Sequence, residues 1–299
     1  MSIDVVPATE TAAAAATTAT YMDNIISVRK ANAKKLAGGY TQTKRIAEIC
    51  YFSLAVCLWM RNVAIVVLYL LHSSESSSNQ LLWSPLMILS AMVLSDFISG
   101  VAHWSFDTWG TPETFLFGNF IRSFREHHVN QMAMTKHDFI ETNADTTLPL
   151  IPLLLIQLYF LGCNSKNNST FRHNIDNDNA GFHVFFLTFA LFIGMTNELH
   201  KWAHLPAPHP FARLLMSCRI VLTRKSHRRH HRGSYDRSCC ITTGWLNAPL
   251  DRVDFWRKAE AVVTALTGAV PRANDRELLG VRHKEETDGE GCNEEFGGL

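Results

Sequence analysis

The sequence lacks the positive charge excess that nucleic-acid-binding proteins usually carry. Its 299 residues include 28 Lys and Arg against 27 Asp and Glu, so the net charge is only +1. The 7 cysteines contain no CxxC pair, and their spacing is unlike that of a secreted disulfide-rich protein. We therefore expect no nucleic-acid partner, no zinc ribbon and no thioredoxin-like site.

Charged residues are also scarce in four apolar stretches. Between Cys50 and His103 only Arg61, Glu75 and Asp96 are charged, and residues 146–163 and 181–197 carry no charge at all. A helix needs about 17–25 apolar residues to cross the hydrocarbon core of a bilayer. The pattern predicts an all-α integral membrane protein with about four transmembrane helices, at about 50–71, 81–102, 146–163 and 181–198. Arg61 should face the bundle interior, unless the first span begins after it.

The distribution of Lys and Arg predicts the orientation of these spans. The segment before the first span, the loop between the second and third, and the region after the fourth are rich in Lys and Arg, whereas the two opposite loops hold only Lys166 and Arg172. Positive residues favour the cytosolic side, so both termini and the middle loop should be cytosolic. We expect a disordered, basic cytosolic segment at 1–48, a membrane-embedded domain at 49–272 and a disordered acidic tail at 273–299.

Most of the 14 histidines fall on the predicted cytosolic side. His200 and His204 are four positions apart at the end of the fourth span, so a helix would place both on one face. The segment from His227 to His231 reads HxxHH, which again places three imidazoles on one helix face. A basic surface for anionic lipid would explain the neighbouring arginines but would not require histidines at this spacing.

Further histidines and acids lie in the second span and the middle loop. Asp96, His103 and Asp107 fall in one column at the cytosolic end of the span, and an acid within a membrane is a candidate functional residue. The predicted metal ligands are His103, His127, His128, His137, His200, His204, His227, His230 and His231. Three acids, Asp107, Asp138 and Glu126, are predicted either as ligands or as acceptors for the second N–H of a ligating imidazole.

This number of histidines exceeds the three or four protein ligands that one zinc ion takes. Imidazole suits iron as well as zinc. A pair of iron ions that activates O₂ for attack on a lipid C–H bond would use all of these histidines. Three other hypotheses stay open on the residues alone: a lipid hydroxylase with the same iron site, a membrane zinc hydrolase, and a non-enzymatic membrane adaptor.

Several longer stretches resemble the Kua-type lipid desaturases, and among them the plasmanylethanolamine desaturase family. The matching segments are SDFISGVAHWSFDTWG (95–110), FREHH (124–128), TKHDFIETNAD (135–145), NELHKWAH (197–204), CITTGWLNAPLD (240–251) and FWRKAE (255–260). The sequence departs from the family pattern after FREHH, and Ser226 and Tyr235 stand where members often carry histidines.

The resemblance implies a di-iron enzyme of the endoplasmic reticulum membrane. It would use O₂ as co-substrate to desaturate the 1-O-alkyl chain of an ether phospholipid, giving the vinyl ether of a plasmalogen. Electrons would come from cytochrome b5 and its NADH-dependent reductase. The family's histidine boxes fall here on catalytic residues His200, His204, His227, His230 and His231. The alternative within the family is a fatty-acyl phospholipid desaturase. Arg228, Arg229 or Arg232 would hold the lipid phosphate.

Overall fold

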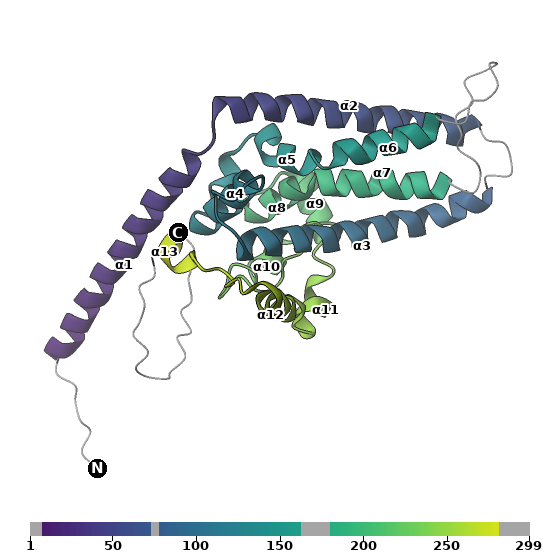
Figure 1. Cartoon of the computed structure of the whole chain (residues 1–299). Coiled ribbons are helices and arrows are strands. Elements are labelled where there is room, and N and C mark those ends of the chain that lie inside the picture. The colour runs from purple at the N-terminus through teal and green to yellow at the C-terminus, as the bar shows by residue number, and fades with distance from the viewer. Residues whose placement is uncertain (1–7, 73–77, 163–179, 281–299) are drawn as a thin grey trace, which may run out of the picture.

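The computed structural model describes residues 8–72, 78–162 and 180–280, and these residues form helices and no strand (Figure 1). In chain order the elements are α1 (Ala8–Ala37), α2 (Gln42–His72), α3 (Ser78–Thr108), α4 (Gly118–Val129), η2 (Met134–Lys136), α5 (Phe139–Thr147), α6 (Leu150–Gly162), α7 (Ala180–Gly194), α8 (Thr196–His204), α9 (Pro210–Ser217), α10 (Arg224–His227), α11 (Asn247–Arg252), α12 (Phe255–Thr267) and α13 (Asp275–Leu279).

Four of these helices, α2, α3, α6 and α7, pack side by side as a bundle (Figure 1). Two continuous segments, Gln42–Leu71 and Trp83–Thr108, are long and apolar enough to cross a membrane. The α5–α6 and α7–α8 pairs raise the number of candidate spans to four if each bent pair forms one span. The prediction of an all-helical membrane protein is therefore confirmed, with two to four candidate spans among the described residues.

The third and fourth predicted spans are bent rather than straight. The chain turns by 61° between Thr147 and Leu150, where Pro149 has no backbone N–H to continue the helix. It turns by 44° between Gly194 and Thr196. Both bends lie at the end of the bundle that carries α4, α5 and α8, opposite the end where α2 ends and α3 begins (Figure 1). The bends bring α5 and α8 into contact at this end.

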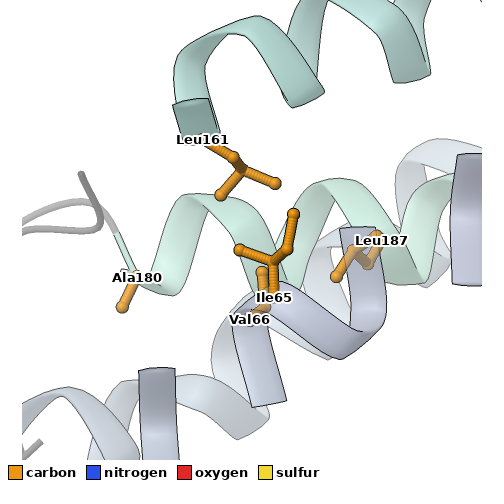
Figure 2. Packing of buried hydrophobic residues seen from close by; sticks show 5 residues of the cluster. All are labelled: Ile65, Val66, Leu161, Ala180 and Leu187. Atoms are coloured by element: carbon orange, nitrogen blue, oxygen red, sulfur yellow. The ribbon is translucent and has the colours of Figure 1, made fainter. Parts of the chain in front are cut away.

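The bundle core consists of aliphatic side chains from three helices. Ile65 and Val66 of α2 lie among Leu161 of α6 and Ala180 and Leu187 of α7, and all are buried (Figure 2). A bilayer is as apolar as these side chains, so close van der Waals packing rather than exclusion of water holds such helices together. The outward faces of the same helices expose further large apolar side chains, as expected of surfaces that contact lipid.

Arg61 does not face the bundle interior, because its side chain is exposed on the outer surface of α2. The next residue, Asn62, turns inward instead and is fully buried. Its side-chain N–H groups donate to the carbonyl of Leu154 at 3.0 Å and to Gln157 Oε1 at 2.9 Å. This polar contact, and not the arginine, fixes α2 against α6 within the bundle.

Helices lie within two segments for which the sequence predicts disorder. Residues 8–37 form the helix α1, where a disordered segment was expected, and residues 275–279 form α13 within the expected disordered tail. Ala is the best helix former, and Ile25 and Leu36 of α1 are buried. Asn32 of α1 also donates to the carbonyl of Leu278 at 3.0 Å. Residues 1–7 and 281–299 lie outside the described part of the chain.

Asp96 of α3 holds the backbone of a distant loop and does not join the histidines. Its Oδ1 accepts from the Oγ1 of Thr242 and from the N–H groups of Thr243 and Gly244, each at 2.8 Å, and its Oδ2 accepts from Leu246 N at 3.0 Å. These donors satisfy both carboxylate oxygens of a fully buried side chain. The prediction that groups Asp96 with His103 and Asp107 as a functional column is therefore wrong for Asp96.

Candidate metal centre

The helix α8 presents His200 and His204 to the interior because its first turn is held from α5. Asn143 Oδ1 accepts a hydrogen bond from Glu198 N at 3.0 Å, and Glu198 Oε1 accepts one from Trp202 Nε1 at 2.7 Å. The first bond satisfies the backbone N–H of Glu198, which has no partner within the first turn of its own helix. Both histidines are buried on the face that points away from solvent.

The HxxHH segment begins at a capped helix. Thr223 Oγ1 accepts from Ser226 N at 3.2 Å, which starts the short helix α10. The backbone then turns with bonds from Arg228 N to Arg224 O and from His230 N to His227 O, each at 3.0 Å. His227, His230 and His231 are buried by this turn.

Five histidines from three segments meet in one group, which we call the five-histidine site. Its members are His127, His200, His204, His227 and His231, and one ring nitrogen of each lies within 4.8 Å of the others. The Nε2 atoms of His200 and His227 are 2.7 Å apart, those of His227 and His231 2.9 Å, and those of His127 and His231 3.0 Å. Imidazole nitrogens that converge in this way present lone pairs to a common point, which is how a metal ion is bound.

A second group, which we call the four-ligand site, lies beside the first. It consists of His103, Asp107, His128 and His230, all buried. Asp107 Oδ2 lies 3.1 Å from His103 Nε2 and 3.3 Å from His230 Nε2, and Asp107 Oδ1 lies 3.3 Å from His128 Nε2. The two sites are contiguous, since His227 and His230 belong to the same turn and their ring centroids are 5.6 Å apart.

The unpartnered polar atoms of the four-ligand site fit a cation. Neither oxygen of Asp107 accepts a hydrogen bond, and His103 Nε2 has no partner either, although both residues are fully buried. A buried carboxylate without a donor is costly, whereas a divalent ion between these atoms would satisfy them all. The residues present therefore suit a metal ion with nitrogen and oxygen ligands.

Two ligands of the four-ligand site are oriented by backbone carbonyls. His103 Nδ1 donates to Cys239 O at 3.0 Å, and His230 Nδ1 donates to Arg237 O at 2.9 Å. A proton on Nδ1 leaves Nε2 as the lone-pair nitrogen, which is the form that coordinates metal. No carbonyl acceptor could have been recognised from the sequence, since every residue has one.

Burial lowers the pKa of four histidines outside the candidate spans: His127, His128, His227 and His231. Desolvation is the main cause for His127, His227 and His231, and neighbouring imidazoles lower the pKa of each further. Burial lowers the pKa of His128 to about 3, although the nearby Asp107 carboxylate opposes the shift. All four imidazoles are thus neutral at pH 7, as metal binding requires.

Acidification should destabilise the metal-free protein. The unfolded chain binds a proton to each histidine near pH 6.5, whereas the folded chain does so only at much lower pH, so unfolding takes up protons in between. The free energy of unfolding should fall by about 1.4 kcal/mol per pH unit for each such histidine. Thermal unfolding of the apoprotein in detergent between pH 7.5 and 5 measures this dependence. A melting temperature independent of pH over this range would contradict it.

Three predicted site residues, His137, Asp138 and Glu126, lie outside both groups. His137 is partly exposed, with its Nε2 3.5 Å from Glu141 Oε1, and both line a pocket that also reaches His127 and His200. Asp138 is an exposed cap of α5, where it accepts from the N–H groups of Ile140 and Glu141.

Glu126 likewise serves a structural contact. Its Oε2 accepts from Arg122 Nη1 at 3.0 Å, so it pairs along α4 and does not hold an imidazole. The prediction of Asp138 and Glu126 as acceptors for ligating imidazoles has no counterpart in these contacts. The hydrogen bonds that orient ligands come instead from the two carbonyls described above.

Sequence reasoning also missed a contact that only the fold creates. Tyr235 departs from the family pattern, which gives it no predicted role. In the structure its ring stacks on that of His128, with centroids 4.1 Å apart and an interplanar angle of 16°. Asn143, which holds α8, lies in the matched segment 135–145 but gave no signal of its role in the sequence.

Comparison with known proteins identifies relatives of this chain. The lipid desaturase domain family matches residues 92–274. Plasmanylethanolamine desaturase 1 of Mus musculus is 38% identical over 251 residues, which cover 82% of this chain and 86% of the mouse protein. Plasmanylethanolamine desaturase of Myxococcus xanthus is 35% identical over 250 residues, covering 83% of this chain and 82% of the bacterial protein.

Plant relatives are more distant. Fatty acid desaturase 4 of Arabidopsis thaliana, a chloroplastic protein, is 28% identical over 186 residues, which cover 60% of this chain and 52% of the plant protein. No solved structure matches the chain. The matched family segment, 92–274, contains both groups of converging ligands.

Proposed function

We propose, since the chain belongs to the lipid desaturase family, that it converts the 1-O-alkyl chain of plasmanylethanolamine into the vinyl ether of plasmenylethanolamine. The observation that carries this proposal is the match over most of the chain to two plasmanylethanolamine desaturases, from a mammal and a bacterium. It is an O₂-dependent oxidoreductase of lipid metabolism that acts within a membrane. The buried groups of histidines supply the metal site that this chemistry requires.

Two iron ions would occupy the centre, one in each site. His127, His200, His204, His227 and His231 would hold one ion, and His103, Asp107, His128 and His230 the other. When bound, the pair would activate O₂ to remove two hydrogen atoms from adjacent carbons of the alkyl chain. The reaction also consumes two electrons and two protons. Together with the two hydrogen atoms from the alkyl chain, they reduce O₂ to two molecules of water.

The protein's own residues would orient the ligands and keep water out. The carbonyls of Cys239 and Arg237 fix two imidazole tautomers, as described above. Burial keeps the remaining imidazoles neutral, so that they coordinate metal rather than bind protons. His137 and Glu141 line the pocket beside the five-histidine site and are not ligands in this assignment.

Electrons must come from a separate donor, and we assign this role to cytochrome b5 with its NADH-dependent reductase. The outer surface of the HxxHH segment supports docking of an acidic carrier, because its cationic residues are exposed: Arg224, Lys225, Arg228, Arg229 and Arg232. These cations flank the buried ligands His227, His230 and His231 in the sequence. Interfaces with complementary charge speed the encounter of such partners. One of the same arginines could instead hold the lipid phosphate.

The enzyme is assigned to the endoplasmic reticulum membrane, with both termini and the metal centre on the cytosolic side. The arrangement supports this assignment in one respect: α4, α8 and α10, which carry five of the predicted ligands, lie at the same end of the bundle (Figure 1). The segments richest in Lys and Arg adjoin this end, in agreement with the positive-inside rule.

The decisive experiment is an assay for vinyl-ether formation. The chain is expressed in cells that make plasmanylethanolamine but no plasmalogen, and acid-labile vinyl ethers are measured by lipid mass spectrometry. Microsomes are assayed in parallel with NADH, with and without cytochrome b5 and its reductase. The proposal predicts a product 2 Da lighter than the substrate, formed only with O₂. A product 16 Da heavier would indicate a hydroxylase, and loss of 2 Da from an acyl chain would indicate an acyl desaturase.

A further inference from the structure

Tyr235 packs against three of the metal-site imidazoles at once. Its ring stacks on His128, with centroids 4.1 Å apart and planes 16° apart. It meets His230 at a centroid distance of 5.7 Å and His231 at 5.9 Å, at steep angles in both cases. Since His128 and His230 belong to the four-ligand site and His231 to the five-histidine site, the tyrosine touches both.

The stacked histidine is the one ligand imidazole of the four-ligand site without a hydrogen bond to orient it. His103 and His230 each donate through Nδ1 to a backbone carbonyl. His128 Nδ1 is buried and has no partner among the described residues. Ligating histidines almost always use the second nitrogen for such a bond. No hydrogen bond from Nδ1 therefore sets the plane of the His128 ring, and the stacked face of Tyr235 is the nearest ring against it.

The backbone at Tyr235 shows that the side chain is placed there against local preference. Its φ is +56°, in the left-handed region that a bulky side chain rarely adopts and that a glycine would occupy without strain. The side chain is nevertheless buried, with only 8% of its surface exposed. Strained backbone of this kind persists where the surrounding structure uses it, often at functional sites.

We propose that Tyr235 is a positioning residue for the second metal ion. Its ring holds the imidazole of His128 so that Nε2 stays beside Asp107 and aimed into the four-ligand site. The aromatic face performs this role and the hydroxyl group does not. This inference rests on the proposed function only in assuming that both sites bind metal, and it concerns binding rather than turnover.

The test compares Tyr235→Phe, which keeps the aromatic face, with Tyr235→Leu, which fills space without a planar ring. Purified apoprotein is titrated with Co²⁺, and the metal content and the visible absorption of the bound ions are recorded. Tyr235→Phe should bind two ions with the wild-type spectrum. Tyr235→Leu should bind the first ion normally and the second about 10–100-fold more weakly. Phe106→Leu is the matched control, because the aromatic contacts of Phe106 among the described residues are with three phenylalanines, stacked on Phe120 and tilted against Phe117 and Phe124, and with no histidine. It should bind both ions normally.

The outcomes separate the two proposals. If the wild type takes up fewer than two ions, the two-ion assignment of the proposed function fails. If the wild type takes up two and Tyr235→Leu matches it in affinity and spectrum, the positioning role is wrong. Loss of the second ion in Tyr235→Phe would also overturn the inference, because it would assign the role to the hydroxyl group. This arm remains informative even if Tyr235→Leu fails to fold.

Discussion

Replacing His227 with Ala should abolish vinyl-ether formation and remove the ion of the five-histidine site. His227 is the central member of that site: its Nε2 lies 2.7 Å from His200 Nε2 and 2.9 Å from His231 Nε2. Its ring is 4.6 Å from that of His204, centroid to centroid. Loss of this imidazole leaves the others without a common centre, and it opens a cavity in a fully buried position. We expect activity below about 1% of wild type, since even indirect ligand contacts cost 10–100-fold in metal affinity or activity.

Lipid mass spectrometry and metal analysis of the purified protein measure the two effects together. The control is His209→Ala, which removes an exposed histidine that caps α9 by accepting from Ala212 N. Loss of that cap should cost about 1 kcal/mol of stability and leave the activity of the folded protein intact. Substantial turnover by a membrane-inserted His227→Ala protein would refute the ligand assignment.

Asp107→Asn and Asp96→Asn should have opposite effects, although both side chains are fully buried in α3. Asp107 accepts no hydrogen bond and faces only imidazoles. Its replacement should weaken binding of the second ion and reduce activity at least about 100-fold. The metal-free protein should lose no stability, because the change removes an uncompensated buried charge.

Asp96 accepts from four donors, and both of its oxygens accept from backbone N–H groups, so Asp96→Asn places an amide N–H against one of these donors. The loop that follows Thr242 should detach, at a cost of about 2–4 kcal/mol in the free energy of unfolding. The protein that remains folded should still bind two ions. Thermal unfolding of the apoproteins and their metal content measure this contrast. A strongly destabilised Asp107→Asn apoprotein, or an Asp96→Asn protein that folds normally but lacks an ion, would contradict the roles assigned here.

These two aspartates also show where sequence reasoning stops. Both stand in one apolar stretch with helical spacing to His103, so sequence pattern alone treats them alike. The difference arises from residues 240–246, which fold back against α3 and bring backbone N–H groups to Asp96 only. In contrast, the pairing of His200 with His204 and of His227 with His231 depends on spacing within a single turn. The sequence therefore predicts that pairing directly.

The bend angles and the packing of the first helix could not be predicted from the sequence for a related reason. Hydropathy identifies the apolar stretches at 146–163 and 181–198, and Pro149 indicates a break near the start of the first of them. Neither signal gives the angles of 61° and 44°, which depend on packing against neighbouring helices. The low-complexity start of the chain has the composition of a disordered tail. Its alanines favour a helix, but the contacts of α1 with α4 and α13 and the burial of Ile25 and Leu36 depend on the fold and are not evident from the local sequence.

The wide separation of contacting segments along the chain has a consequence for biosynthesis. Asp275 of α13 forms an ion pair with the buried Arg125 of α4, two residues before His127, and Arg29 of α1 donates to the carbonyl of Leu279 at 3.0 Å. The helix α4, which carries His127 and His128, is thus held by contacts with α1 and α13, two segments whose bonded residues Arg29 and Leu279 are 250 positions apart. Because the converging side chains range from His103 to His231, the set is complete only after residue 231 has been synthesised, so we expect metal uptake to follow synthesis of this part of the chain.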